Sequence, residues 1–210
     1  MPPYVDVGSL LLPAGYLCAS LDLPYHGEAE VPGRPAMIPG WAWAVAHGED
    51  FVAEFVARAR HVLDFLVAQG HADPARLAVA GNSRGGYCAC HWAAAAERLG
   101  CVAAFIPATD LRVLREFAEQ PPGGLCERLR LVNVAPALAR RALWVTIGNH
   151  DQRVGTAQTS EFACAVMAQA VAQDLSPEVE LHVTTARGHS TSATAAGEAA
   201  AGIRSHLQRP

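Results

Sequence analysis

A serine between glycines is the first feature of this sequence that could do chemistry. Residues 81–85 read Gly-Asn-Ser-Arg-Gly and end a short apolar run. A G-x-S-x-G pattern between a strand and a helix is typical of a sharp turn that lifts the serine hydroxyl out of the sheet, and only small flanking residues avoid the neighbouring backbone there. Free N–H groups at the start of the next helix favour negative charge. The motif therefore predicts Ser83 as a nucleophile.

The same five residues allow a purely structural interpretation. Glycine-rich turns lead from strands into helices, and serine is a favoured N-cap because its side chain accepts a hydrogen bond from a helix N–H. The motif by itself does not separate a nucleophile from an N-cap.

Two residues further along the chain favour the chemical interpretation. A serine hydroxyl is a poor nucleophile until a base removes its proton. In this setting the chain order is serine, acid, histidine. Asp151 follows one apolar run, and His189 lies in a loop of small residues after the last one. We predict a triad of Ser83, Asp151 and His189, in which His189 moves the proton and Asp151 orients the imidazole.

Apolar runs that alternate with helical patterns would position these residues. Five runs are predicted as buried strands, at residues 16–23, 76–81, 101–108, 142–149 and 179–186. Predicted helices cover residues 48–70, 83–99, 156–173 and 195–207. This alternation predicts one α/β domain over residues 1–210, with a mostly parallel sheet flanked by helices.

Two irregular stretches, residues 24–47 and 110–141, follow strand ends, where open α/β sheets bind their ligands. The first stretch holds three aromatic candidates for substrate binding, Tyr25, Trp41 and Trp43. The tryptophans would either contact an apolar acyl group or pack the loop against the body of the protein.

Three arginines are expected near the site because of the loops that carry them. They are Arg84, Arg112 and Arg153, and Arg112 is the candidate for substrate binding. A guanidinium group binds a carboxylate well. Ordinary surface arginines are the alternative.

Composition narrows the class of protein. The 210 residues are 51% hydrophobic and 17% charged, which is typical of a packed globule. A net charge of −4 argues against nucleic acid as a partner, and no apolar run reaches the roughly 20 residues of a membrane span. No secretion signal is recognised, and the six cysteines contain no C-x-x-C pair, so we expect a cytoplasmic protein with reduced thiols. We expect no metal and no cofactor.

The motif and its partners resemble the α/β-hydrolases, nearest to the branch of dienelactone hydrolases and prolyl-oligopeptidase-like proteins. The resemblance runs from about Gly15 to the C-terminus and rests on residues 72–87, 103–117, 143–156 and 186–190. It implies hydrolysis of esters and, in some members, of amides or peptides. It also implies the backbone N–H of Arg84 as one donor of the oxyanion hole.

The resemblance also implies strands that are not found before residue 15. Members usually carry three, and the loop after the third provides a second oxyanion donor. We therefore expect an N-terminally shortened fold in which residues 16–23 pair with 76–81 or leave an apolar edge open, and an open edge favours a homodimer. Residues 4–12 are an alternative source of a short strand. His26 and Gly27 are interpreted as a tight turn.

Two functions follow. The first is a serine hydrolase that cleaves carboxylic esters of small to medium molecules through an acyl-enzyme, with peptidase activity as a variant. The second is a weak or inactive hydrolase-like binding protein, because loss of one oxyanion donor costs roughly 10²–10³ in rate. The substrate, the preference for esters or amides, the second donor, the natural start and the oligomeric state are open at this point.

Overall fold

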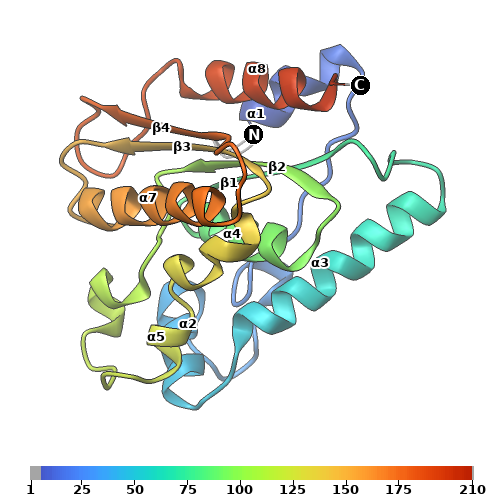
Figure 1. The fold of residues 1–210 in the computed structure, drawn as a ribbon. Helices are drawn as coiled ribbons and strands as arrows, with labels where there is room; N and C mark the ends of the chain where they lie inside the picture. Colours follow the sequence, from blue (N-terminus) through green and yellow to red (C-terminus); the bar gives the residue numbers. More distant parts are fainter. Residues whose placement is uncertain (1–5, 210) are drawn as a thin grey trace.

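Four parallel strands form the sheet that positions the predicted site residues (Figure 1). The computed structural model describes residues 6–209. The strands lie in the order in which they occur in the chain: β1 (Leu77–Asn82), β2 (Leu99–Phe105), β3 (Ala142–Gly148) and β4 (Val179–Thr184). Because parallel strands end at one edge of the sheet, the loops after β1, β3 and β4 can meet there.

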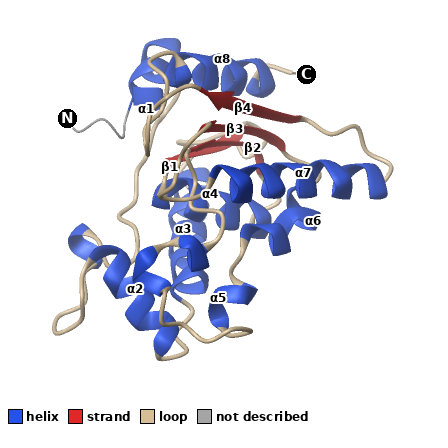
Figure 2. Ribbon diagram, turned by 90° about the vertical axis from the view of Figure 1, so that its left-hand side faces the viewer, coloured by secondary structure: helices blue, strands red, loops and turns tan. Residues whose placement is uncertain are grey.

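Helices cover both faces of this sheet (Figure 2). The α-helices are α1 (Asp6–Leu11), α2 (Met37–Ala46), α3 (Phe51–Ala68), α4 (Arg84–Ala95), α5 (Leu125–Arg128), α6 (Ala135–Leu138), α7 (Thr156–Ala172) and α8 (Ala195–Leu207). Short 3-10 helices are η2 (Leu12–Ala14), η3 (Gly27–Ala29), η4 (Leu111–Val113), η5 (Arg115–Phe117) and η6 (Leu131–Val134). None of the helices in residues 6–209 is both long enough and apolar enough to cross a membrane.

The sheet separates two apolar cores. The larger core joins α3, α4 and α7 to one face of the sheet, through residues such as Phe51, Tyr87 and Phe162. The smaller core lies under α1 and α8, where Leu11 and Ile203 pack with Trp144 of β3. Helices on both faces explain why the strands are apolar along almost their whole length.

The predicted strands agree with the observed ones except at the N-terminus and at the end of β2. The prediction of a strand over residues 16–23 is wrong, because this segment has no ladder partner among the described residues. It instead runs past the edge of the sheet: Tyr16 packs on the smaller core, and Leu21 and Leu23 pack on the larger one. Strand β2 ends at Phe105 because Ile106 turns the chain with φ of 39°.

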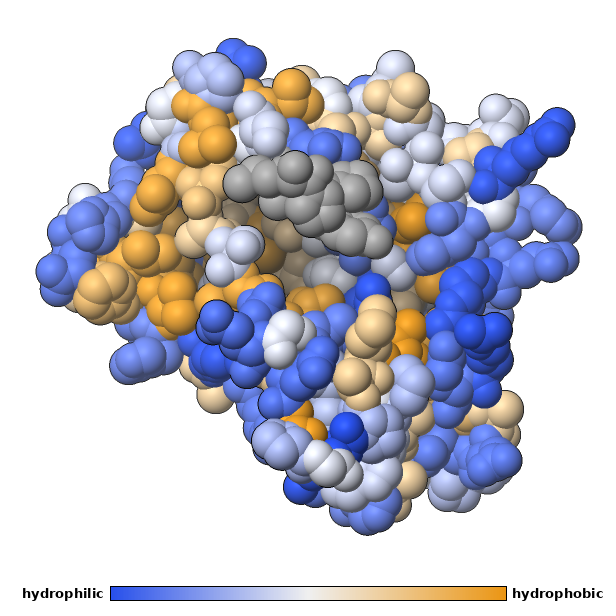
Figure 3. All heavy atoms as spheres, turned by 180° about the vertical axis from the view of Figure 1, so that it is seen from behind, coloured by the Kyte–Doolittle hydropathy of each residue, from blue (hydrophilic) through white to orange (hydrophobic). Residues whose placement is uncertain are grey.

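Residues 4–12 do not provide a described strand either. Asp6–Leu11 form α1, which packs on α8, and residues 4 and 5 lie outside the described part. Large apolar side chains stay exposed along this part of the chain, at Leu10, Leu12 and Leu17. On the side turned away from the viewer in Figure 1, apolar surface gathers around a hollow (Figure 3).

The stretch interpreted as irregular, residues 24–47, contains the helix α2. Trp41 of this helix is fully buried, and its ring stacks on Phe51 with centroids 4.6 Å apart. Gly40 allows the tight packing, since a Cβ there would lie 2.3 Å from the carbonyl oxygen of Pro35. Burial of the Trp41 ring therefore stabilises α2. The sequence of this stretch, which mixes Gly and Pro with apolar residues, does not by itself indicate a helix.

Candidate active site

The turn between β1 and α4 holds Ser83 in a conformation that few residues adopt. Its φ of 52° and ψ of −108° lie outside the helical and extended regions. Gly81 makes the turn possible, because a Cβ there would lie 2.2 Å from the carbonyl carbon and oxygen of Gly85. Gly85 itself has open space around its Cα, so only the first glycine of the motif is required by packing.

The structure brings Ser83, His189 and Asp151 into one chain of hydrogen bonds. His189 Nε2 lies 2.8 Å from Ser83 Oγ, and His189 Nδ1 lies 2.8 Å from Asp151 Oδ2. A carboxylate only accepts, so Nδ1–H donates to Asp151 and Nε2 is left to accept the proton of Ser83. This is the tautomer that a general base toward serine needs.

Backbone groups of its own loop hold the Asp151 carboxylate in place. Its Oδ1 accepts from the N–H of Arg153 at 2.9 Å and from that of Val154 at 3.1 Å. Thr156 donates to the carbonyl of Gly148 at 2.6 Å and accepts from the N–H of Asp151 at 3.1 Å, which ties the loop to the end of β3. The Asp151 side chain is fully buried, whereas 27% of the His189 side chain is exposed.

The N-cap alternative for Ser83 has a clear structural outcome. Ser83 does occupy the N-cap position of α4, but its side chain makes no capping hydrogen bond. The hydroxyl is directed to His189 instead. The backbone N–H of Arg84 opens α4, and N–H groups of a first helical turn have no partner within the helix.

The aromatic candidates for substrate binding lie inside the protein or are covered. Trp41 is fully buried, and its Nε1–H donates to Pro24 O at 2.7 Å, so this structure corrects its expected place at the open wall of a pocket. Tyr25 is also buried, and its hydroxyl accepts from Arg34 at 3.0 Å. Trp43 is half-buried beneath the Arg34 guanidinium, 4.3 Å from the ring centroid.

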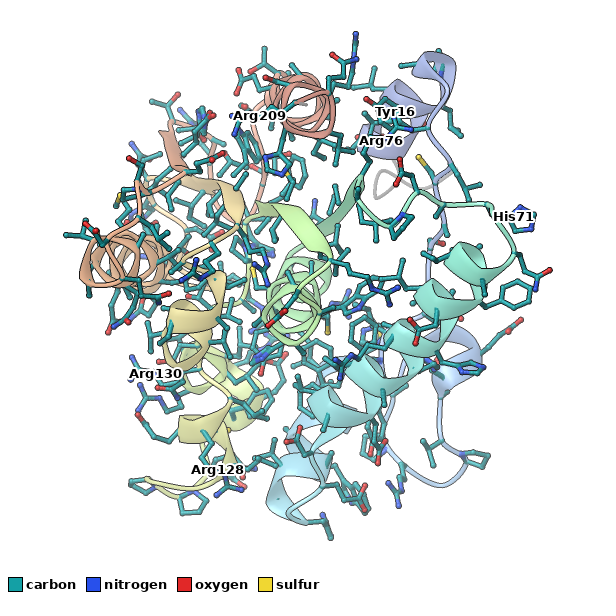
Figure 4. The ribbon with its side chains drawn as sticks, turned by 45° about the vertical axis from the view of Figure 1, so that its right-hand side comes forward. Tyr16, His71, Arg76, Arg128, Arg130 and Arg209 are labelled. Atoms are coloured by element: carbon teal, nitrogen blue, oxygen red, sulfur yellow. The ribbon has the colours of Figure 1, made fainter. Side chains whose placement is uncertain are left out.

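Arg112 is engaged in ion pairs with two carboxylates of the chain. It binds Asp110 through Nε and Nη2 and also contacts Glu127. Burial would raise the pKa of Asp110, but hydrogen bonds from Arg112 and the charge of Arg130 outweigh it and lower this pKa. Arg130 also donates to Asp110, from Nε to Oδ2 at 3.0 Å, and Figure 4 labels Arg130. The cluster packs the loop after β2, and a role of Arg112 in substrate binding stays a prediction.

Two residues near the site were missed in the sequence. Glu116 binds the Arg153 guanidinium with both oxygens, at 2.8 and 2.9 Å, beside the Asp151 loop. His26 reaches Arg84, whose Nη1 lies 2.5 Å from His26 Nε2. The His-Gly pair at 26–27 was the available signal for the second contact. As interpreted, it does form a turn, with Gly27 at φ of 55°.

A parallel sheet with a serine at its strand-to-helix turn defines this protein as an α/β-hydrolase. Residues 40–207 match the prolyl oligopeptidase family, and the chain belongs to that family. The comparison with curated proteins gave no match.

Solved structures share this fold at low sequence identity. TT1662 from Thermus thermophilus is 22% identical with a TM-score of 0.67, over 90% of this chain and 76% of that one. A puromycin-hydrolysing peptidase of Mycobacterium tuberculosis is 22% identical with a TM-score of 0.55, over 73% of this chain and 24% of that one. The acylaminoacyl peptidase of Pyrococcus horikoshii is 13% identical with a TM-score of 0.51, over 69% of this chain and 24% of that one. This chain thus spans about a quarter of those two peptidases.

Proposed function

We propose that this chain is a serine hydrolase that cleaves peptide or other amide bonds of small substrates, and activated esters, through an acyl-enzyme on Ser83. The observation that carries the proposal is the hydrogen-bond chain from Ser83 through His189 to Asp151, with the serine in a strained turn. The sequence alone led us to expect cleavage of an ester bond. Because the chain belongs to the prolyl oligopeptidase family, we propose an amide bond instead. The peptidases among the similar folds support the same choice.

The proposed reaction uses only residues of this site and water. Ser83 Oγ attacks the carbonyl carbon while its proton passes to His189 Nε2, and Asp151 stabilises the imidazolium that forms. The negative oxygen of the tetrahedral intermediate lies at the N-terminus of α4, where the N–H of Arg84 donates to it. His189 then gives the proton to the leaving nitrogen or oxygen. A water molecule that His189 deprotonates releases the acyl group.

A fluorophosphonate probe and two substrates test this proposal. The probe reacts with an activated serine, and the substrates are an aminoacyl 4-nitroanilide and a 4-nitrophenyl ester. We expect Ser83→Ala to abolish labelling and to lower kcat/KM by about 10⁴-fold or more, because no other group forms the acyl-enzyme.

The control for this experiment is Ser205→Ala, on the exposed side of α8. It should keep both labelling and turnover. Equal turnover by the Ser83→Ala variant would contradict the mechanism. If the wild-type protein shows neither labelling nor turnover, the binding protein with an incomplete oxyanion hole replaces the hydrolase.

A further inference from the structure

Of the three arginines expected near Ser83, two have their charge compensated by carboxylates. Arg112 is paired with Asp110 and Glu127, and Arg153 is held by both oxygens of Glu116. Arg84 has no ion pair with any carboxylate in the described part of the chain. Its side chain is only half-buried, so a small molecule can reach it.

A neutral histidine, rather than an acid, holds the Arg84 side chain. A guanidinium group only donates, so Arg84 Nη1–H donates to His26 Nε2. The proton of the His26 ring is therefore on Nδ1, which donates to Pro24 O at 2.7 Å. Burial lowers the pKa of His26, and the charge of Arg84 lowers it further, against the hydrogen bond to Pro24. His26 is thus neutral at pH 7 and leaves the positive charge of Arg84 uncompensated.

The surroundings of His26 keep this arrangement in place. The imidazole meets the ring of Trp41 edge-on, with centroids 5.9 Å apart, and Trp41 donates to the same Pro24 carbonyl. The carboxylates of Asp22 and Glu30 also act on His26. Asp22 accepts from the backbone N–H of Glu28 at 2.9 Å, and neither carboxylate bonds Arg84. The guanidinium keeps most of its five donors available.

We propose that the Arg84 guanidinium, positioned by His26, is the subsite for a carboxylate carried by the substrate of Ser83. This inference rests on the proposed function. Arg84 follows Ser83 directly in the chain, and we take its guanidinium to lie within reach of the substrate that Ser83 attacks. On this proposal the carboxylate lies a few bonds from the carbonyl that Ser83 attacks. A guanidinium group matches the geometry of a carboxylate and remains charged at all relevant pH values.

Matched pairs of esters test this subsite. 4-Nitrophenyl hexanoate and the 4-nitrophenyl half-ester of adipic acid differ only in the end of the acyl chain, a methyl group or a carboxylate. A second pair, the butyryl esters of 4-hydroxybenzoic acid and of its methyl ester, places the carboxylate on the leaving group. The pair with the larger ratio of kcat/KM, acidic over neutral, identifies the side of the substrate that faces Arg84.

For that pair we expect the wild-type protein to prefer the acidic ester by roughly 10- to 100-fold, as for a charge-assisted hydrogen bond. Arg84→Met should remove this preference, and Arg84→Glu should reverse it. The matched control is Arg76→Met, which removes the same charge at the opposite end of β1, where Arg76 is exposed and pairs with Asp73 (Figure 4). It should keep the preference.

The positioning role of His26 has its own readout. His26→Leu should raise KM for the acidic ester about 10-fold with little change in kcat, because Arg84 loses its acceptor. His26→Gln, whose amide oxygen also accepts from Arg84, should restore most of the preference. Equal KM values in wild type and His26→Leu would refute this role.

The two proposals fail in different ways. Equal kcat/KM for both esters of each pair, with Ser83 still labelled by the fluorophosphonate, overturns the subsite and leaves the hydrolase intact. An absence of labelling and turnover with every ester overturns the hydrolase. In that case protection of the protein against thermal unfolding by adipate, compared with hexanoate, still tests the subsite: protection by adipate that is lost in Arg84→Met supports it, and no difference between the two acids overturns it.

Discussion

The protonation state of single ionisable side chains in this protein depends on their surroundings. His91 of α4 shows this for a buried base, because only 7% of the residue is exposed and its Nε2–H donates to Leu129 O at 3.1 Å. Burial lowers the pKa of His91 from its ordinary 6.5 to about 4, against the effect of that hydrogen bond. Asp110 shows the opposite case, in which arginines keep a buried carboxylate charged. The fold therefore contains groups whose protonation destabilises it.

We expect His91 to contribute to acid unfolding. Between pH 6.5 and pH 4 the unfolded chain protonates this histidine and the folded chain does not, so stability falls as the pH falls through this window. The loss amounts to roughly 3 kcal/mol for the whole shift. In His91→Gln the amide still donates to Leu129 O, and the pH dependence of the free energy of unfolding should decrease by about this amount. Urea titrations at several pH values measure it, and parallel curves for the two proteins would contradict it.

At the scale of elements, the site depends on how β1 turns into α4. The turn brings the carbonyl of Gly85 against Gly81. A side chain is therefore excluded at Gly81 but not at Gly85. The loops after β3 and β4 need only to begin at the same edge of the sheet, and they do so because the strands are parallel. The turn at Ser83 is thus the part of the site whose backbone geometry must be exact. The loops that carry Asp151 and His189 are placed by the parallel sheet.

Two alanine substitutions test this difference between the two glycines of the motif. Gly81→Ala places a Cβ 2.2 Å from the carbonyl of Gly85, and we expect a loss of stability on the order of 3 kcal/mol or more. Gly85→Ala has open space and lies in a helix, so it should gain about 0.5 kcal/mol. Urea unfolding followed by circular dichroism compares them. A Gly81→Ala protein as stable as Gly85→Ala would show that the turn can open without cost.

For the whole molecule, the main consequence of the N-terminal arrangement is the edge at β1, which pairs with no further strand in residues 6–209. The N–H of Ser83 donates to Phe105 O at 2.7 Å, so β1 directs alternate groups to β2, and those of Ala78, Ala80 and Asn82 point away from it. These outward groups have no hydrogen-bond partner in residues 6–209. The strand carries neither a charged residue nor a proline to protect the edge. The expected homodimer remains a prediction, and this edge is where it would form.

A pair of proline variants tests that prediction. Ala80→Pro removes an N–H that points away from β2, so the sheet can keep its ladder while the edge loses a donor. Val79→Pro removes an N–H that points to β2 and serves as the matched control, which should destabilise the fold. By light scattering we expect the wild-type protein at twice the chain mass and Ala80→Pro at the chain mass. A wild-type protein that stays monomeric at high concentration would contradict the dimer.

Much of this arrangement could be predicted from the sequence, because it depends on local patterns. Four of the five predicted strands and all four predicted helices are present, since apolar runs and helical periodicity are local properties. Residues 16–23 are the exception, because a strand also needs a partner and none lies beside this segment among the described residues. The three proposed catalytic residues could be proposed from the sequence because each follows a strand that ends at the same edge, and their catalytic roles stay a prediction.

The sequence alone determined the turn between glycines, because the turn depends on neighbouring residues. It also determined the order of serine, acid and histidine, because that order follows from the order of the strands along the chain. Only the tertiary structure decided that Trp41 is fully buried while Trp43 is not, and that Arg84, of the three arginines expected near the site, pairs with no carboxylate in residues 6–209. Those outcomes depend on pairings between distant parts of the chain: Arg153 meets Glu116, and Arg84 meets His26. Each such contact forms only when folding brings the two partners together, so no local pattern records it.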